Sequence, residues 1–189
     1  MNKDNILIVC ALEIETQGKL DDWNIIYTGC GKVNATYELT KEINSVFIPK
    51  LVINFGTAGS REIPIHTLVD CNQFIQRDMN ATELGFFKGQ TPFEDELIMD
   101  FSHINNSIGK GYVCGSGDNF VENIEDEIVH IDVFDMEAYA LAKVCYKVGI
   151  DFVSFKYITD NVNEKSANDW KENYSKGITK FKKLLNELL

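Results

Sequence analysis

Arginine is scarce in this chain, which has two arginines, Arg61 and Arg77, among its 18 basic residues. Its 29 acidic residues give it a formal net charge of -11. Nucleic-acid binding depends on the neutralisation of phosphates by basic side chains, and arginine forks are the usual ligands of phosphate and carboxylate groups. The composition therefore argues against a nucleic-acid partner and against a site that binds a free anion.

The five cysteines and three histidines form no pattern typical of a metal site or a disulfide framework. The cysteines are far apart, contain no CxxC pair and lie mostly in apolar segments, so we expect buried free thiols in a reducing compartment. The histidines, His66, His103 and His130, are isolated in the sequence. We therefore predict a protein that binds no metal and uses no other cofactor.

Long apolar segments are also missing, since no run of about 18 apolar residues is present. Residues 1–4 lead directly into a strand pattern and do not resemble a signal peptide, so we expect a cytoplasmic protein with no membrane partner. A chain of 189 residues, 44% of them hydrophobic, can bury a substantial core. Because no repeat or proline-rich linker interrupts it, we predict a single domain over residues 1–189.

Short apolar segments alternate with amphipathic segments along the chain. Strands are expected at residues 5–11, 51–55, 67–76, 111–114, 131–134 and 152–158. Helices are expected at residues 34–45, 135–148 and 167–189. We expect the glycine-rich residues 56–59 to form a turn that closes the second of these strands. This alternation predicts an α/β fold with a central, largely parallel sheet covered on both faces by helices.

Acidic residues follow several of the predicted strands, at the edge where an open α/β sheet binds its ligands. They are Glu13, Glu15, Asp135, Glu137 and Asp160. Cleavage of a bond between a sugar carbon and a base nitrogen needs an acid for the leaving base and a carboxylate beside the attacking water. Taken singly, each acid is more typical of a helix N-cap or first turn. Their shared position favours a site but does not decide between the two interpretations.

Two glycine-rich segments, residues 56–59 and 115–118, also follow predicted strands. Glycine lets the backbone approach a ligand closely, but the first segment fits a tight connection equally well. Phe120, after the second segment, is typical of a core residue and also of a ring that stacks on a planar base. The acidic run at residues 122–127 is typical of a solvated face.

Six segments together resemble the nucleoside phosphorylase/nucleosidase superfamily, in the order that its members have them. They are ALEIE (11–15), GCGKVNA (29–35), VINFGTAG (52–59), SGDNF (116–120), DMEA (135–138) and ITD (158–160). Within the superfamily, the chain is most similar to the 5′-methylthioadenosine/S-adenosylhomocysteine nucleosidases. The resemblance implies a three-layer α/β fold with a central mixed, mostly parallel sheet, and usually a homodimer. An additional hairpin of the family is missing after residue 23, so we expect a shortened sheet.

The resemblance assigns catalytic roles to two carboxylates. Glu15 matches the residue that holds and activates the attacking water. Asp160 matches the residue that donates a proton toward N7 of the departing purine. A third carboxylate, Glu137, matches the residue that accepts hydrogen bonds from the ribose hydroxyls.

Five further residues match positions that contact the substrate in the family. Met136 would pack against the sugar and Phe120 would stack on the base. Thr57 falls near the water and the ribose, where the family often has serine. Leu12 and Trp170 would surround the 5′ substituent, which favours an apolar 5′ group over a phosphate.

The resemblance implies a purine nucleosidase that hydrolyses a small-molecule nucleoside, methylthioadenosine or S-adenosylhomocysteine, to adenine and a ribose derivative. Phosphorylases of the superfamily hold phosphate with several arginines, one of them just before the glycine-rich segment, where this chain has residues 53–55 (INF). Neither Arg61 nor Arg77 matches a phosphate ligand of the family, although phosphorolysis and non-catalytic nucleoside binding stay open as alternatives. Residues 76–92 depart from the usual nucleosidase sequence where the family borders the active site and can reach a neighbouring subunit, which leaves the 5′ group open.

Overall fold

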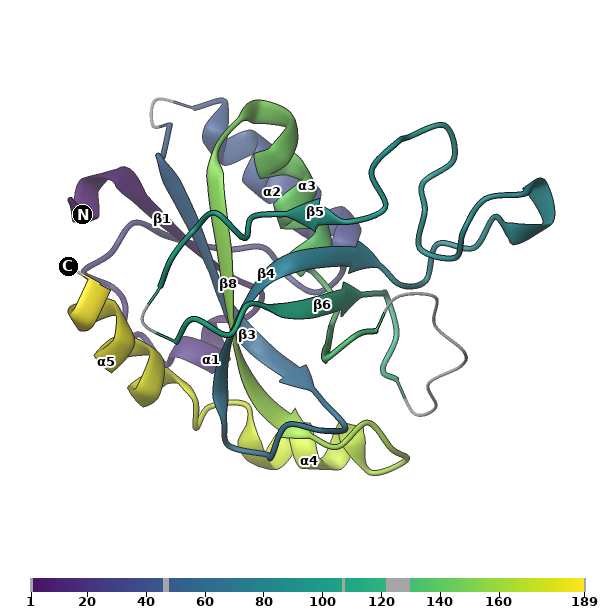
Figure 1. The fold of residues 1–189 in the computed structure, drawn as a ribbon. Coiled ribbons are helices and arrows are strands. Elements are labelled where there is room, and N and C mark those ends of the chain that lie inside the picture. Colours follow the sequence, from purple (N-terminus) through teal and green to yellow (C-terminus); the bar gives the residue numbers. More distant parts are fainter. Residues whose placement is uncertain (1, 46–47, 107, 122–129, 189) are drawn as a thin grey trace.

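The computed structural model describes residues 2–45, 48–106, 108–121 and 130–188, and the strands within these ranges join in one mixed sheet (Figure 1). The strands are β1 (Ile6–Cys10), β2 (Ile25–Tyr27), β3 (Leu51–Gly59), β4 (Leu68–Gln76), β5 (Met99–Asp100), β6 (Tyr112–Ser116), β7 (Val133–Asp135) and β8 (Asp151–Asp160). β8 pairs with both β3 and β4, while β6 and β7 connect β4 back to β3. Five strands therefore close into a ring, and β1 and β2 extend the sheet from β3.

Helices cover both sides of the sheet (Figure 1). They are α1 (Glu13–Thr16), α2 (Lys32–Ile43), α3 (Ala138–Val148), α4 (Ser166–Asn173) and α5 (Ile178–Leu188), with short 3-10 turns η1 (Lys3–Asn5) and η2 (Thr82–Leu84). None of the helices in the described ranges is long and apolar enough to cross a bilayer.

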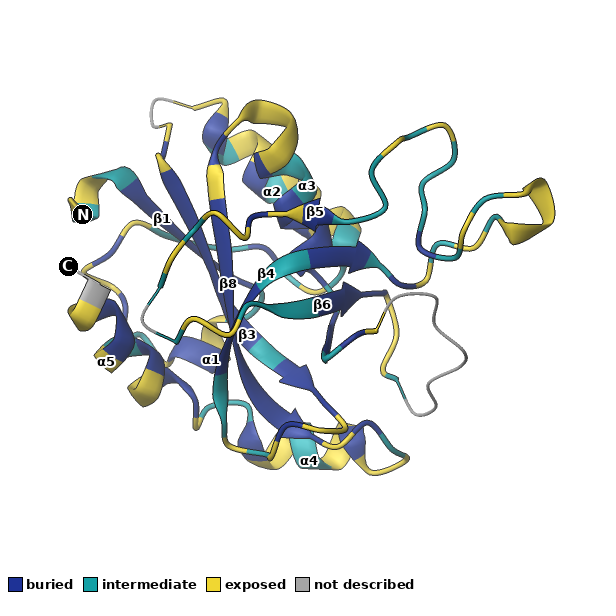
Figure 2. Ribbon diagram, viewed as in Figure 1, coloured by how far each residue is buried: buried dark blue, intermediate teal, exposed yellow. Residues whose placement is uncertain are grey.

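The side chains of β1 alternate between two hydrophobic cores, as the period of two in a strand requires. Leu7 and Val9 pack in the core that contains α2 and α3, whereas Ile6 and Ile8 pack in the core that contains α5. Figure 2 shows β1, β3 and β8 buried along most of their length. The three-layer α/β prediction is thus confirmed, because strands buried on both faces need helices on both sides.

Residues 56–59 do not form the predicted turn. They continue β3, and each pairs in parallel with β8 as far as Gly59, which lies opposite Asp160. A Cβ at Gly59 would lie 2.7 Å from Oδ1 of Asp160, so a side chain would displace this carboxylate. Glycine has little strand propensity of its own, and pairing with β8 supplies the hydrogen bonds that hold it in the sheet.

All three predicted helices have different bounds, and α2 is shifted by two residues from the predicted 34–45. Asp135 belongs to β7, and α3 begins only at Ala138. The long helix predicted at residues 167–189 is two helices, α4 and α5, separated at residues 174–177. A Cβ at Gly177 would lie 2.5 Å from the Tyr157 ring, so the chain passes too close to β8 there for any larger residue.

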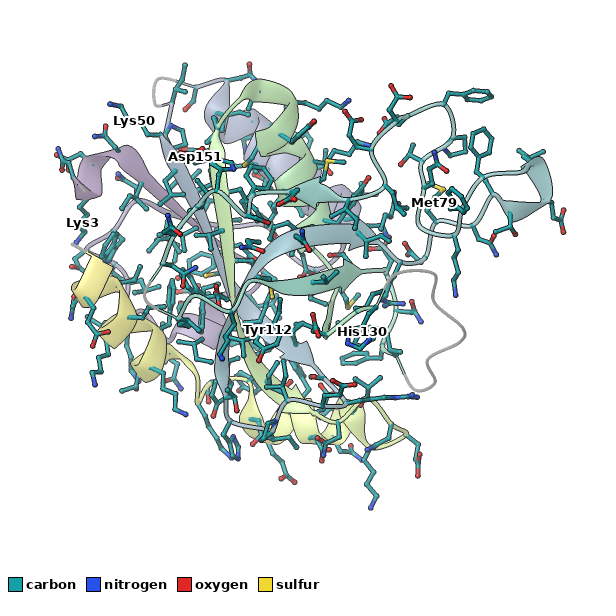
Figure 3. The ribbon with its side chains drawn as sticks, in the orientation of Figure 1. Lys3, Lys50, Met79, Tyr112, His130 and Asp151 are labelled. Atoms are coloured by element: carbon teal, nitrogen blue, oxygen red, sulfur yellow. The ribbon has the colours of Figure 1, made fainter. Side chains whose placement is uncertain are left out.

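Residues 77–98, between β4 and β5, leave the sheet as an extended arm (Figure 1). Figure 3 marks Met79 on this arm, away from the layers of the fold. The arm contains most of residues 76–92, the segment expected to depart from the usual nucleosidase sequence. The acidic run at residues 122–127 lies outside the described residues.

Candidate active site

A cavity of about 300 Å³ lies at the carboxyl ends of β1, β3, β6, β7 and β8. All eight residues assigned from the resemblance line it: Leu12, Glu15, Thr57, Phe120, Met136, Glu137, Asp160 and Trp170. Glu13, which also follows β1, is exposed on α1 and does not line the cavity. The shared position of acids at strand ends was therefore a useful signal for four of the five acids, since Asp135 lines the cavity too.

Glu15 is anchored at both carboxylate oxygens. Its Oε1 accepts the backbone N–H of Thr57 at 3.0 Å and the Thr57 hydroxyl at 2.9 Å, and its Oε2 accepts the N–H of Leu12 at 3.1 Å. Only 3% of Glu15 is exposed. Burial raises the pKa of Glu15, and the bonds from Thr57 and Leu12 oppose this rise. The hydrogen bonds therefore hold the carboxylate in one orientation, while burial makes it more basic.

Asp160 ends β8 and is also held at both oxygens. Oδ1 accepts the N–H of Val162 at 3.1 Å, and Oδ2 accepts the Thr159 hydroxyl at 3.1 Å. The parallel pairing of β3 with β8 sets Gly59 beside this carboxylate and leaves it facing the cavity. Asp160 and Glu15 therefore reach one cavity from opposite ends of the sequence.

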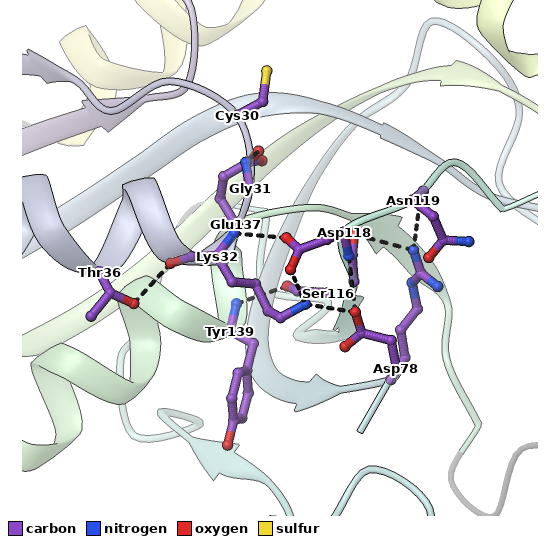
Figure 4. A network of polar contacts seen from close by, with 12 residues as sticks. Cys30, Gly31, Lys32, Thr36, Asp78, Ser116, Asp118, Asn119, Glu137 and Tyr139 are labelled. Carbon is purple, nitrogen blue, oxygen red and sulfur yellow. Dashed lines mark hydrogen bonds and ion pairs between the residues drawn. The ribbon is translucent and has the colours of Figure 1, made fainter. Parts of the chain in front are cut away.

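Glu137 has a single described hydrogen bond, in which the N–H of Gly31 donates to its Oε1 at 2.8 Å (Figure 4). Gly31 precedes α2, and its φ of 91° lies in the left-handed region that favours glycine. Burial, followed by the nearby charge of Asp135, raises the pKa of Glu137 to about 7. This carboxyl group can therefore change its protonation near neutral pH.

Lys156 was not among the predicted site residues, yet it is a buried cation on the cavity wall. Its Nζ lies 2.7 Å from Oδ2 of Asp135, and each side chain is 1% exposed. Burial opposes the ionisation of both groups, but their mutual attraction lowers the pKa of Asp135 and raises that of Lys156. The sequence did contain a sign of this residue, namely a lysine within the apolar strand at residues 152–158. A lysine buried in such a strand needs a buried partner of opposite charge.

Polar contacts hold the segment that carries Phe120 (Figure 4). The Arg77 guanidinium donates to the carbonyls of Gly117, at 3.3 Å, and of Asn119, at 2.6 Å. Asp118 accepts both the backbone N–H and the Nζ of Lys32, each at 2.8 Å. Arg77 thus lines the cavity while it supports a loop, and Phe120, 48% exposed, presents its ring there.

Cys30 is the exception to the prediction that the cysteines are buried. The other four cysteines are buried, whereas Cys30 is exposed and lines the cavity. It stands between two glycines with positive φ, Gly29 and Gly31, so the chain turns sharply there and no core forms around the thiol.

His130 is less isolated than its sequence position suggests. Its Nε2 lies 3.1 Å from Asp132 and 4.0 Å from Glu62, and in the described part of the chain these three residues could place ligand atoms within 4.8 Å of one another. Figure 3 marks His130. None of the three lines the cavity, and Glu62 and His130 are exposed.

Comparison with known proteins gives the family. The family model described as the phosphorylase superfamily matches residues 16–189. The 5′-methylthioadenosine/S-adenosylhomocysteine nucleosidase of Haemophilus influenzae (strain PittEE) is 30% identical over 178 residues, which are 82% of this chain and 76% of that protein. The enzyme of the same name from Staphylococcus haemolyticus (strain JCSC1435) is 28% identical over 176 residues, 82% of this chain and 77% of that protein.

Solved structures share the fold. A mutant of the Helicobacter pylori methylthioadenosine/S-adenosylhomocysteine nucleosidase, with 5′-methylthioadenosine in its active site, matches with a TM-score of 0.83 and 22% identity, over 99% of this chain and 100% of that one. The futalosine hydrolase of Helicobacter pylori strain 26695 matches with a TM-score of 0.83 and 22% identity, over 97% of each chain.

The chain therefore belongs to the phosphorylase superfamily, as its six segments and its sheet indicated. More narrowly, it is an N-glycosyl hydrolase with nucleosidase activity, like the relatives of the same superfamily. The predicted family, fold class and enzyme class are confirmed. Structures named for two different nucleosides share its fold, which leaves the substrate to be identified.

Proposed function

We propose that this chain hydrolyses the N-glycosidic bond of a 5′-modified adenosine, such as methylthioadenosine or S-adenosylhomocysteine, and releases adenine and a ribose derivative. One observation carries the proposal, namely that Glu15, Glu137 and Asp160 line a single cavity. Its volume, about 300 Å³, is within the range of small-molecule sites. The names of the relatives support the choice of substrate class.

In the proposed reaction, a water oxygen attacks the anomeric carbon while the bond from this carbon to N9 of the purine breaks. Glu15 accepts a proton from the water, and its buried position supports this role because burial raises its pKa and so its basicity. Asp160 gives its proton to N7, so that the purine leaves as a neutral base with the electron pair of the broken bond. Glu137 accepts hydrogen bonds from the ribose hydroxyls.

Four further residues that line the cavity would contact the base, the sugar and the 5′ substituent of the nucleoside. Phe120 would stack on the base, and Met136 would pack against the sugar. Leu12 and Trp170 would contact the 5′ substituent, which supports an apolar group at this position. Residues 76–92, most of which lie in the arm, are expected to depart from the usual nucleosidase sequence, so a 5′ group other than methylthio or homocysteine is the variation we expect first.

Water is favoured over phosphate as the nucleophile because two cations of the cavity, Lys156 and Arg77, are bound to groups of the protein itself. Lys156 is paired with Asp135 at 2.7 Å, and one nitrogen of Arg77 donates to two carbonyl groups. Arg61 is exposed and does not line the cavity. A phosphorylase needs cations directed at phosphate, whereas these side chains stabilise the protein itself.

Asp160→Asn tests the chemistry. We expect the wild type to release adenine from methylthioadenosine in phosphate-free buffer. Mass spectrometry would measure this release beside that from adenosine, inosine and S-adenosylhomocysteine. In the variant, the rate of adenine release should fall at least about a hundredfold. Asp151→Asn is a matched control, because Asp151 begins the same strand and lies at its opposite, exposed end (Figure 3). A phosphate requirement with a sugar 1-phosphate as product would identify a phosphorylase, and tight binding without turnover would identify a nucleoside-binding protein.

We also propose a homodimer. Large apolar side chains are exposed on α2, where Val33 is 78% and Tyr37 is 64% exposed, and on the arm, where Phe93 is 93% exposed. A groove of about 420 Å³ lies between α2 and α3. Analytical ultracentrifugation of the wild type should give twice the monomer mass. The Tyr37→Lys variant should sediment with a smaller mass, because a charge replaces an apolar contact. A wild-type monomer at micromolar concentration would contradict the proposal.

The sheet supports the prediction that residues 1–189 form one domain, because every strand in the described ranges belongs to it. A cytoplasmic location stays a prediction.

A further inference from the structure

Trp170 makes a polar contact that its apolar role does not require. Its indole N–H donates to the Thr57 hydroxyl at 2.9 Å, and this hydroxyl donates to Oε1 of Glu15 at 2.9 Å. The three residues come from α4, β3 and α1, which are far apart in the sequence. A phenylalanine would fill the same wall of the cavity, so the hydrogen bond is what distinguishes the tryptophan.

The direction of both hydrogen bonds follows from the chemistry of the donors. An indole N–H can only donate, and a hydroxyl has one proton and two lone pairs. Because a lone pair of Thr57 Oγ1 accepts from Trp170, its proton is free to point at Glu15. The backbone N–H of Thr57 donates to the same oxygen at 3.0 Å, so two donors of one residue fix Oε1. Trp170 therefore selects one rotamer of the hydroxyl.

The indole is itself held in place. The Tyr174 ring packs against it with centroids 5.2 Å apart and planes tilted by 32°. Trp170 lines the cavity together with Ala167 and Lys171 of α4, and Tyr174 is the residue that caps this helix. The position of α4 is thus connected to Glu15 through two hydrogen bonds.

We propose that Trp170 is a positioning residue, which orients the Glu15 carboxylate toward the attacking water through the Thr57 hydroxyl. The inference rests on the proposed function, because it assumes that Glu15 is the base. It adds that α4, the helix beside the 5′ substituent, also fixes the orientation of Glu15, the general base. A substrate that displaces the indole would disturb Glu15 without touching it.

Trp170→Phe keeps a ring on the cavity wall and removes the donor. We expect kcat to fall about fivefold to tenfold with KM changed less than twofold, as for the loss of one hydrogen bond. Glu15 acts in its ionised form, and the variant stabilises this form less well. Its pKa should therefore rise, and the acid limb of the kcat/KM profile should move to higher pH.

A double-mutant cycle separates positioning from packing. In a Thr57→Val background the connection to Glu15 is already broken, so Trp170→Phe should have no further effect on kcat. Trp23→Phe is the matched control, since Trp23 is buried beside Lys3 and does not line the cavity, and its activity should equal the wild type. An equal loss in both backgrounds, or a loss confined to KM, would overturn the proposal.

An NMR measurement tests the connection without catalysis. The chain has two tryptophans, so [15N]tryptophan labelling gives two indole signals, and Trp170→Phe identifies one by its loss. The Trp170 signal should titrate with pH in the wild type and stay constant in Glu15→Gln and in Thr57→Val, while the Trp23 signal serves as a reference. A Trp170 signal that does not titrate would overturn the proposal. A wild type that releases no adenine would instead refute the proposed function.

Discussion

Asp70 and Glu15 are both buried carboxylates with three hydrogen-bond donors, yet their surroundings differ. Asp70, on β4, is fully buried and accepts the side-chain amide of Asn106 and the N–H groups of Lys110 and Gly111 at 2.8–3.1 Å. Glu15 accepts its three donors from Leu12 and Thr57 at 2.9–3.1 Å. Asp70 lines neither the cavity at the strand ends nor the groove between α2 and α3, whereas Glu15 lines the cavity.

Satisfied hydrogen bonds alone therefore do not distinguish a structural carboxylate from a reactive one. The donors of Asp70 all come from residues 106–111, so this carboxylate closes a loop onto the sheet. The donors of Glu15 leave the carboxylate facing the cavity beside Gly56, where a Cβ would lie 3.7 Å from Oε1. Access to a ligand, and not the number of donors, separates the two roles.

The largest effect is expected for Glu15→Gln. The amide keeps the shape of the side chain but cannot accept a proton from water, so kcat should fall about a thousandfold, or roughly 4 kcal/mol. Stability should fall by only about 1 kcal/mol, because removal of the buried charge offsets most of the cost of placing an amide NH2 against the N–H of Leu12. Steady-state kinetics and urea unfolding measure the two quantities. Wild-type kcat together with a clear loss of stability would instead place Glu15 with Asp70 as a structural residue.

Asp70→Asn should show the opposite pattern. The introduced NH2 group meets N–H donors where an acceptor is needed, so the free energy of unfolding should fall by about 3 kcal/mol. Adenine release per folded molecule should equal that of the wild type, since Asp70 does not line the active-site cavity. Urea unfolding and an activity assay at low temperature provide the test. Lost activity at unchanged stability would remove the distinction between the two carboxylates.

Glu137 differs from both of these carboxylates, because it is buried with one described donor and its pKa is raised to about 7 from 4.5. The folded state therefore binds the proton more tightly than the unfolded state between these values. Relative to Glu137→Gln, the wild type should lose stability as pH rises from 4.5 to 7, by at most about 1.4 kcal/mol per pH unit, and change little above pH 7. Unfolding curves of both proteins at pH 5 to 8 measure this difference. Parallel stability profiles would show that Glu137 stays ionised throughout.

Local pattern predicted the strands well where apolar residues run together. β1, β4 and β8 lie within one or two residues of their expected bounds, because burial on both faces of a sheet needs such sequences. The same reasoning was wrong for Gly56 to Gly59, whose strand conformation depends on pairing with β8. It also joined α4 to α5, since the approach of Gly177 to Tyr157 is a contact between distant residues.

The amino-acid sequence was enough to predict the alternation of strands and helices, the acids that follow strands and, through its six segments, the family. The pairing of Lys156 with Asp135 and the path from Trp170 through Thr57 to Glu15 became visible only in the folded chain. The two kinds of feature differ in the sequence distance over which their interactions act. Strand and helix preferences act between residues a few positions apart, whereas a buried charge or an indole donor is stabilised by partners that the fold brings from 21 or 113 positions away.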